Sequence, residues 1–136
     1  MPLIFTKLGS VAQLDEVRVG SLDGLGIALF KNDFIPTSAS VLADFTEAAF
    51  PGYAPQSLIM ATPAFLNGQG RAEADANIVT FTATGASAEI MYGYFLYDAG
   101  LVVRYAQRFA GPQPMTVAGA ALDVGVKFTE VSEFNG

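Results

Sequence analysis

Apolar residues are densest in two neighbouring stretches in the second half of the chain, and both predict β-strands. Residues 88–97 (AEIMYGYFLY) and 101–109 (LVVRYAQRF) are rich in aromatic and aliphatic side chains, which favour strands. Asp-Ala-Gly at 98–100 predicts a short hairpin loop between them. Pro112 and Pro114 predict the end of this hairpin, because proline cannot donate to a strand ladder.

Four other segments are predicted strands. Residues 78–84 are rich in β-branched residues, whereas 25–31 and 56–61 carry weaker patterns. The NGQG sequence at 67–70 predicts the tip of a hairpin. Apolar and polar positions alternate along 122–129, as in a strand with one buried face, and the apolar set is Leu122, Val124, Val126 and Phe128.

One segment near the start predicts a helix instead, over residues 8–19. Val11, Leu14 and Val17 recur at helical spacing. The spacing of Ser10 and Gln13 is that of a capping box, and Gly20 is a residue that commonly ends a helix. A single helical turn is also expected within 40–45.

Together these elements predict a mainly β fold. Several short strands, frequent glycine and proline turns and one short N-terminal helix indicate an antiparallel β-sandwich or barrel. A length of 136 residues without repeats, linkers or low-complexity tracts predicts one domain over 1–136.

The surface of this domain is expected to be poor in charge. Hydrophobic residues make up 51% of the chain and charged residues 15%, against about 25% charged in an average globular protein. Part of such a surface is expected to meet another subunit, the alternative being a monomer covered by small neutral residues. The net charge of −6 argues against nucleic acid and anionic membranes as partners. No signal peptide or membrane-spanning run is expected.

The chemistry available to the chain argues against an enzyme. There is no His and no Cys, which excludes serine or cysteine triads, histidine bases and zinc sites. Paired carboxylates, Asp44 with Glu47 or Glu73 with Asp75, could in principle hydrolyse glycosides, but there is no Trp to stack on a sugar.

Glu73, Asp75 and Asn77 alternate like calcium ligands on an extended segment. Ile78 and Thr84 occupy the positions where a calcium loop of the EF-hand type needs Gly and Glu. The acidic pair is therefore interpreted as part of a solvated strand edge. No metal and no cofactor are expected.

Five residues of the 88–109 region are candidates for a contact between subunits. Arg104 and Arg108 lie on one face of a strand and flank Tyr105, and Arg and Tyr are enriched at interfaces. The segment 90–97 is apolar on both faces, so we expect a partner to cover the face of Tyr92 and Tyr94. The alternative for the arginines is the wet face of a sheet.

Several short segments resemble small proteins encoded among the virion genes of tailed bacteriophages. The resemblance covers residues 28–60 and 90–111. It is carried by LFKND at 29–33 running through Pro36 into VLADFTE at 41–47, by FPGYA at 50–54, and by YGYF at 92–95, DAG at 98–100 and QRF at 107–109.

The resemblance implies a virion protein, made in the bacterial host cytoplasm, rather than an enzyme. The leading hypothesis is a capsid decoration (cement) protein that bridges copies of the major capsid protein. Such a decoration protein is expected to be a homo-oligomer, with a trimer favoured by the local symmetry of a capsid. A tail, fibre or baseplate component that contacts the host is the alternative within this class. A small carbohydrate-binding module or hydrolase is the alternative of another class.

Overall fold

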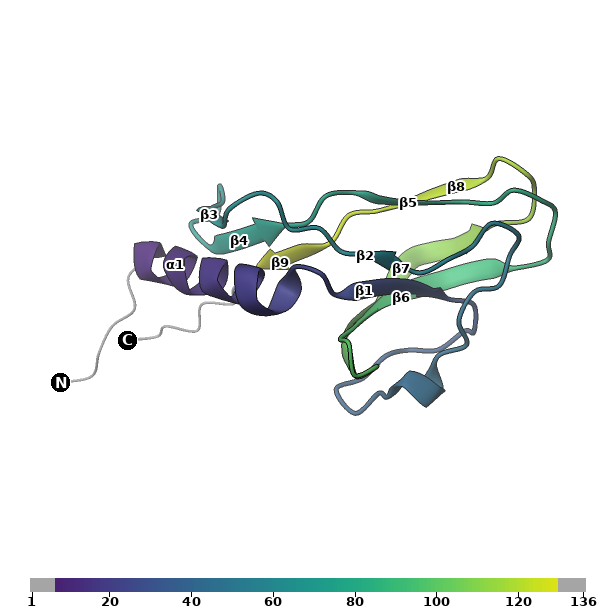
Figure 1. Ribbon diagram of the computed structural model, residues 1–136, viewed down its shortest axis with the longest axis horizontal. Helices are drawn as coiled ribbons and strands as arrows, with labels where there is room; N and C mark the ends of the chain where they lie inside the picture. Colours follow the sequence, from purple (N-terminus) through teal and green to yellow (C-terminus); the bar gives the residue numbers. More distant parts are fainter. Residues whose placement is uncertain (1–6, 130–136) are drawn as a thin grey trace. The chain divides into compact units, whose positions relative to one another are not determined.

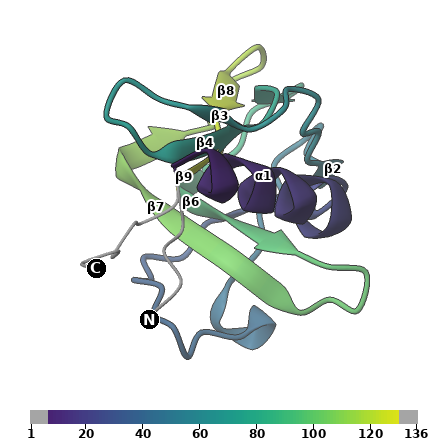
Figure 2. The same cartoon turned by 90° about the vertical axis from the view of Figure 1, so that its left-hand side faces the viewer.

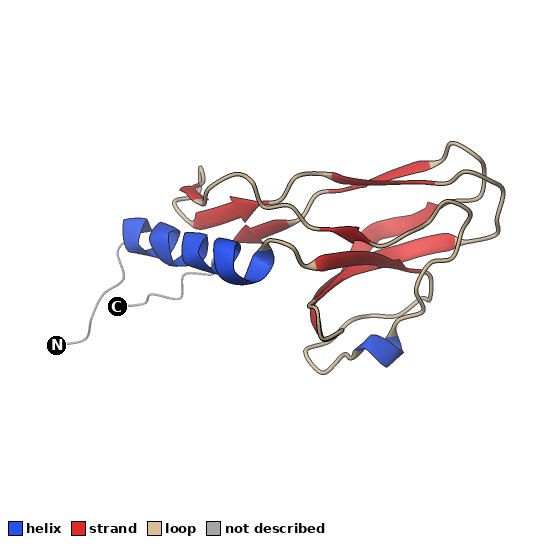
Figure 3. Cartoon of the chain, viewed as in Figure 1, coloured by secondary structure: helices blue, strands red, loops and turns tan. Residues whose placement is uncertain are grey.

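The computed structural model describes residues 7–129 and is mainly β, as the sequence predicts (Figure 3). The strands form three antiparallel sheets, and one short helix lies near the N-terminus. The sheets do not close on themselves. Of the two predicted architectures, the barrel is therefore wrong and the open, sandwich-like arrangement is confirmed.

Backbone contacts divide the described chain into two compact units. Unit 1 comprises residues 7–24, 58–78 and 125–129, and unit 2 comprises 25–57 and 79–124. Neither unit is continuous in sequence. The single domain over 1–136 stays a prediction.

A four-stranded antiparallel sheet forms the centre of unit 2 (Figure 1). Its order is β2 (Gln56–Ser57), β1 (Gly26–Phe30), β6 (Ile90–Tyr97) and β7 (Val103–Pro114). β1 and β6 are buried on both faces, which explains why both read as continuous apolar runs. β7 continues through Pro112, contrary to the prediction, because it is an edge strand, where a missing N–H is tolerated.

Each face of this sheet is covered by a different part of unit 2. The pair of β5 (Val79–Thr82) and β8 (Ala121–Val124) lies on one side, and the segment 31–50 lies on the other (Figures 1 and 2). The segment 31–50 includes the 3₁₀ helix Leu42–Asp44, in the predicted place. Its Phe45 stacks on Phe95 of β6, with ring centroids 4.8 Å apart, and completes an aromatic cluster with Phe30.

Unit 1 combines the helix with a three-stranded sheet. The helix α1 (Lys7–Val17) packs against the central strand of the order β3 (Phe65–Leu66), β4 (Ala72–Asp75) and β9 (Lys127–Thr129) (Figure 2). The hairpin tip predicted at 67–70 joins β3 to β4. There the amide of Gly70 donates to the carbonyl oxygen of Asn67.

Two predictions about the ends of the helix are wrong. Ser10 lies inside α1 and is buried, so it does not cap the helix. Gly20 lies within a π-helical turn, Arg18–Leu22, that continues the helix and buries Leu22. The amide of Asp23 closes this turn on the carbonyl of Arg18, and Gly24 follows with a φ of 87°, so the glycine that ends the helix is Gly24.

The predicted strand 122–129 is confirmed in its alternation but not in its continuity. Leu122, Val124 and Val126 are buried, while Asp123 and Lys127 are exposed. The hydrogen-bonded ladder nevertheless stops after Val124 and resumes at Lys127, as β8 and β9 of two different sheets. Side-chain alternation reports the extended backbone and not which strand it pairs with.

Candidate functional site

The hairpin of β6 and β7 ends in a loop that the side chain of Asp98 organises. Its Oδ1 accepts hydrogen bonds from the amides of Gly100 at 2.9 Å and Val102 at 3.1 Å. Its Oδ2 accepts a bond from Nε of Arg104 at 2.8 Å. The backbone bonds and this guanidinium together lower the pKa of Asp98. The carboxylate thus favours its ionised form and links the backbone of the loop to the side chain of Arg104.

This loop presents apolar side chains to solvent. Leu101 is 59% exposed, Val102 is 52% exposed and Tyr105 is 44% exposed. With Arg104 these residues form what we call the hairpin surface. Beside it lies a shallow cavity of about 90 Å³, where the hairpin meets the segment 31–50, and its lining residues are Thr37, Ser38, Ser40, Val103, Arg104, Tyr105 and Ala106.

The two candidate arginines bind different acidic groups of their own chain. Arg104 pairs with Asp98 at 2.8 Å and remains largely exposed. Nη1 of Arg108 lies 2.6 Å from Oδ1 of Asp33 and donates to the carbonyl of Phe34. Arg108 therefore fastens the segment 31–50 to the sheet, whereas Arg104 contributes to the hairpin surface.

Tyr92 and Tyr94 pack against different parts of unit 2, contrary to the expectation that one partner covers both, and the ladder of β6 and β7 shifts register at Tyr92. Met91 is opposite Gln113, but Gly93 is opposite Arg108, so β7 bulges. Tyr92 packs against the aromatic cluster of Phe30, Phe45 and Phe95, and the guanidinium of Arg108 lies 5.6 Å from the centre of its ring.

Tyr94 is covered by its own chain. It is only 7% exposed, and its hydroxyl donates to Oε1 of Gln107 at 2.8 Å. This burial raises the pKa of its phenol. The ring therefore offers no surface to a partner, and of the five candidates only Arg104 and Tyr105 lie on the hairpin surface.

Unit 1 contains a second polar feature, on β4. The sequence interpretation placed Glu73 and Asp75 on a solvated edge, but β4 is the central strand of its sheet and Glu73 is only 6% exposed. Oε1 of Glu73 accepts a hydrogen bond from Nδ2 of Asn67 at 3.1 Å, and Oε2 lies 3.7 Å from Nζ of Lys127. Asn77 follows β4, and its backbone N–H donates a hydrogen bond to the backbone carbonyl oxygen of Ile59.

The carboxylates of the other pair considered for hydrolysis bind separate groups of their own chain. Oδ2 of Asp44 accepts the amide of Val41 at the start of the 3₁₀ helix. Oε2 of Glu47 accepts the hydroxyl of Tyr53 at 2.6 Å. Each carboxylate therefore has a local structural partner.

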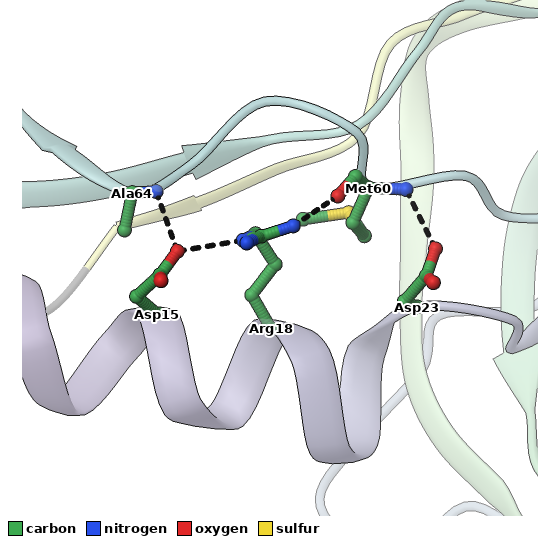
Figure 4. Close-up of polar contacts among 5 residues, drawn as sticks. All are labelled: Asp15, Arg18, Asp23, Met60 and Ala64. Atoms are coloured by element: carbon green, nitrogen blue, oxygen red, sulfur yellow. Dashed lines mark hydrogen bonds and ion pairs between the residues drawn. The ribbon is translucent and has the colours of Figure 1, made fainter.

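Charged residues of the helix and of the turn that follows it bind the irregular segment 60–64 of unit 1 (Figure 4). The sequence alone did not predict these contacts. Asp15 accepts Nε of Arg18 and the amide of Ala64, and Arg18 donates to the carbonyl of Met60. Asp23 accepts the amide of Met60 at 2.9 Å. The three-residue spacing of Asp15 and Arg18 is typical of an ion pair on a helix. Their backbone partners lie more than forty residues away in the sequence, so local spacing could not predict those contacts.

Within residues 7–129, no group of three or more acidic side chains is close enough together to hold a metal ion. No helix in this part of the chain is long and apolar enough to span a membrane. Comparison with models of protein families, with curated proteins and with solved structures finds no match to this chain.

Proposed function

We propose that this protein is a structural component of a bacteriophage particle, most specifically a capsid decoration protein, and that it works by binding rather than by catalysis. The proposal rests on the resemblance of its sequence segments and on one observation at the hairpin surface. That observation is the conformation and exposure of Leu101.

Leu101 has an unusual backbone conformation for its residue type and an unusually exposed apolar side chain. Its φ of 60° lies in the left-handed region, which costs a residue with a bulky side chain about 1 kcal/mol and which Gly, Asn or Asp would occupy more readily. Its side chain is 59% exposed, at the tip of a loop where polar residues are usual. An exposed leucine in a strained backbone conformation stabilises neither the loop nor the core. Its presence here therefore supports a role in contact with another molecule.

The surroundings of Leu101 suit such a contact. Val102 and Tyr105 add apolar and aromatic area, and Arg104 adds a guanidinium already paired with Asp98. A stable contact between proteins buries about 1,200–2,000 Å² in total. The hairpin surface alone is too small for that area, so we expect the contact to extend over the exposed apolar residues of the adjoining segment, Ile35, Val41 and Leu42.

A decoration protein would stabilise the shell by this burial. Each copy would place its hairpin surface against the major capsid protein or against a neighbouring copy, with a trimer matching the local symmetry of a capsid. Exclusion of water from the apolar side chains would supply the binding free energy.

The test compares Leu101→Asn with Val117→Asn. Val117 is a matched control in unit 2, because it is 61% exposed and does not lie on the hairpin surface. Asn tolerates the left-handed region, so the Leu101→Asn chain should melt at the same temperature as the wild type or slightly higher. Sedimentation of each chain alone and with purified capsid shells would measure assembly.

We expect Leu101→Asn to weaken self-association or shell occupancy about tenfold, the effect of one lost leucine contact of about 1.5 kcal/mol. Val117→Asn should leave both unchanged. A wild-type chain that stays monomeric and does not bind capsid shells would contradict the proposal. Equal effects of the two substitutions would contradict it as well. In intact particles, a copy number near that of the major capsid protein would support decoration, and a few copies would indicate the tail instead.

A further inference from the structure

We propose that Glu73 and Asp75 share one proton, carried by Asp75 and donated to Glu73, and that this pair makes the folding of unit 1 depend on pH. The proposal is independent of the proposed function, since it concerns a buried feature of β4.

The position of the two carboxyl groups brings them together. Residues two apart in a strand point to the same face, so Glu73 and Asp75 are neighbours on β4. β4 lies between β3 and β9, and Glu73 is 6% exposed. The carboxyl group of Glu73 is therefore buried next to that of Asp75, which is partly exposed but has a buried Oδ1.

One side-chain oxygen of Asp75 is an unsatisfied polar atom. Its Oδ1 is buried and has no hydrogen-bond partner among the described residues. An ionised carboxylate can only accept hydrogen bonds, so it cannot bond to a second carboxylate. A proton on Asp75 changes this atom from an unsatisfied acceptor into a donor, and Glu73 is the acceptor beside it.

The surroundings decide which residue carries the proton. Glu73 accepts a bond from Asn67 and faces the ammonium group of Lys127 at 3.7 Å, and both contacts favour its ionised form. Within the part of the chain that the structure describes, Oδ1 of Asp75 has no donor, and the ammonium group of its ladder partner Lys127 lowers the pKa of Asp75 by less than burial and Glu73 raise it. The pKa values follow this asymmetry: the bond from Asn67 lowers that of Glu73, whereas burial and the neighbouring Glu73 raise that of Asp75.

The other charged side chains that the structure describes on the elements around β4 are engaged or exposed. β9 contributes Lys127, and β3 contributes no titratable residue. On α1, Asp15 is bonded to Arg18 and the amide of Ala64, and Glu16 is exposed. Among the side chains that the structure describes on these elements, Lys127 is thus the charged group that contacts the pair.

The stability of unit 1 should therefore peak where the pair holds one proton. The folded pKa of Glu73 is lowered, so its contribution is lost as the pH falls through that value and the bond from Asn67 to the carboxylate is weakened. The folded pKa of Asp75 is raised, so its contribution is lost as the pH rises through that value and two carboxylates face each other.

The experiment follows the side-chain carboxyl carbons of Glu73 and Asp75 by NMR in the full chain during a pH titration. We expect Asp75 to remain protonated at pH values where an ordinary aspartate is ionised, and both signals to report two shared steps. A pKa of Asp75 at or below the usual aspartate range would overturn the proposal. The titration uses the wild-type chain, so its result does not depend on whether a variant folds.

Denaturation across the same pH range would test the consequence. Asp75→Asn replaces the proton with an amide N–H that can donate to Glu73 at every pH, so it should remove the loss of stability on the alkaline side and keep the acid side. Glu16→Gln is the control, because it removes an exposed carboxylate of unit 1. Identical pH profiles for the two variants would overturn the proposal.

Discussion

The ring of Phe30 occupies the space where a side chain on Gly93 would begin. The two residues are direct partners in the ladder of β1 and β6, and Arg108 is the partner of Gly93 on the other side. A Cβ atom on Gly93 would lie 2.5 Å from Cζ of Phe30 and would overlap the carbonyl oxygen of Gln107. Glycine is thus required here by the close approach of its neighbours.

Gly93→Ala should destabilise the fold. The methyl group would have to displace both an aromatic ring of the core and the backbone of β7, and overpacking of this kind costs about 1–3 kcal/mol or more. Gly111→Ala is the control, because no atom lies within 4 Å of a Cβ at that position. Urea denaturation should show a large loss for the first substitution and little for the second.

Tyr94 should matter to folding rather than to assembly. Tyr94→Ala removes a buried ring next to Phe109 and should cost about 3–5 kcal/mol. Tyr94→Phe removes only the hydrogen bond to Gln107 and should cost about 1 kcal/mol. The melting of these variants should be compared with that of Tyr105→Ala on the hairpin surface, and an equal or smaller loss for Tyr94→Ala would contradict the burial of its ring.

Asp15 should make the anchoring of residue 64 sensitive to acid. The hydrogen bond from Arg18, followed by that from the amide of Ala64, lowers the pKa of Asp15. Its contribution is therefore present above the usual aspartate range and is lost as the pH falls through the lowered value. Hydrogen exchange at the amide of Ala64 should accelerate in Asp15→Asn and not in Glu16→Gln. Equal protection in both would show that the carboxylate does not hold this amide.

Tyr53 should resist ionisation for as long as unit 2 is folded. Its ring stacks on Phe81 and its hydroxyl donates to Glu47, and burial, together with this bond, raises the pKa of the phenol far above its usual range. In an alkaline titration followed by tyrosinate absorbance, part of the signal should appear only when the chain unfolds. Tyr53→Phe should reduce that late step, whereas a fully gradual titration in the wild type would contradict the buried hydroxyl.

Local patterns in the sequence were enough to predict the fold class and most strands. The apolar runs of β1 and β6, the alternation through 122–128 and the turns at 67–70 and 98–100 depend on backbone geometry within a few residues, and the structure places them as predicted. The absence of His and Cys likewise limits the available chemistry without any structure.

The strand partners, the register and the burial of polar residues depended on pairing between segments that are distant in sequence. Alternation along 122–129 could not reveal that the ladder changes partner after Val124. The register shift at Tyr92 likewise depends on how β6 pairs with β7. The central place of β4 buries Glu73 and partly buries Asp75, which the sequence alone had placed on a solvated strand edge. The physical reason is that alternation assigns side chains to a face of a strand, whereas only the tertiary contacts determine what covers that face.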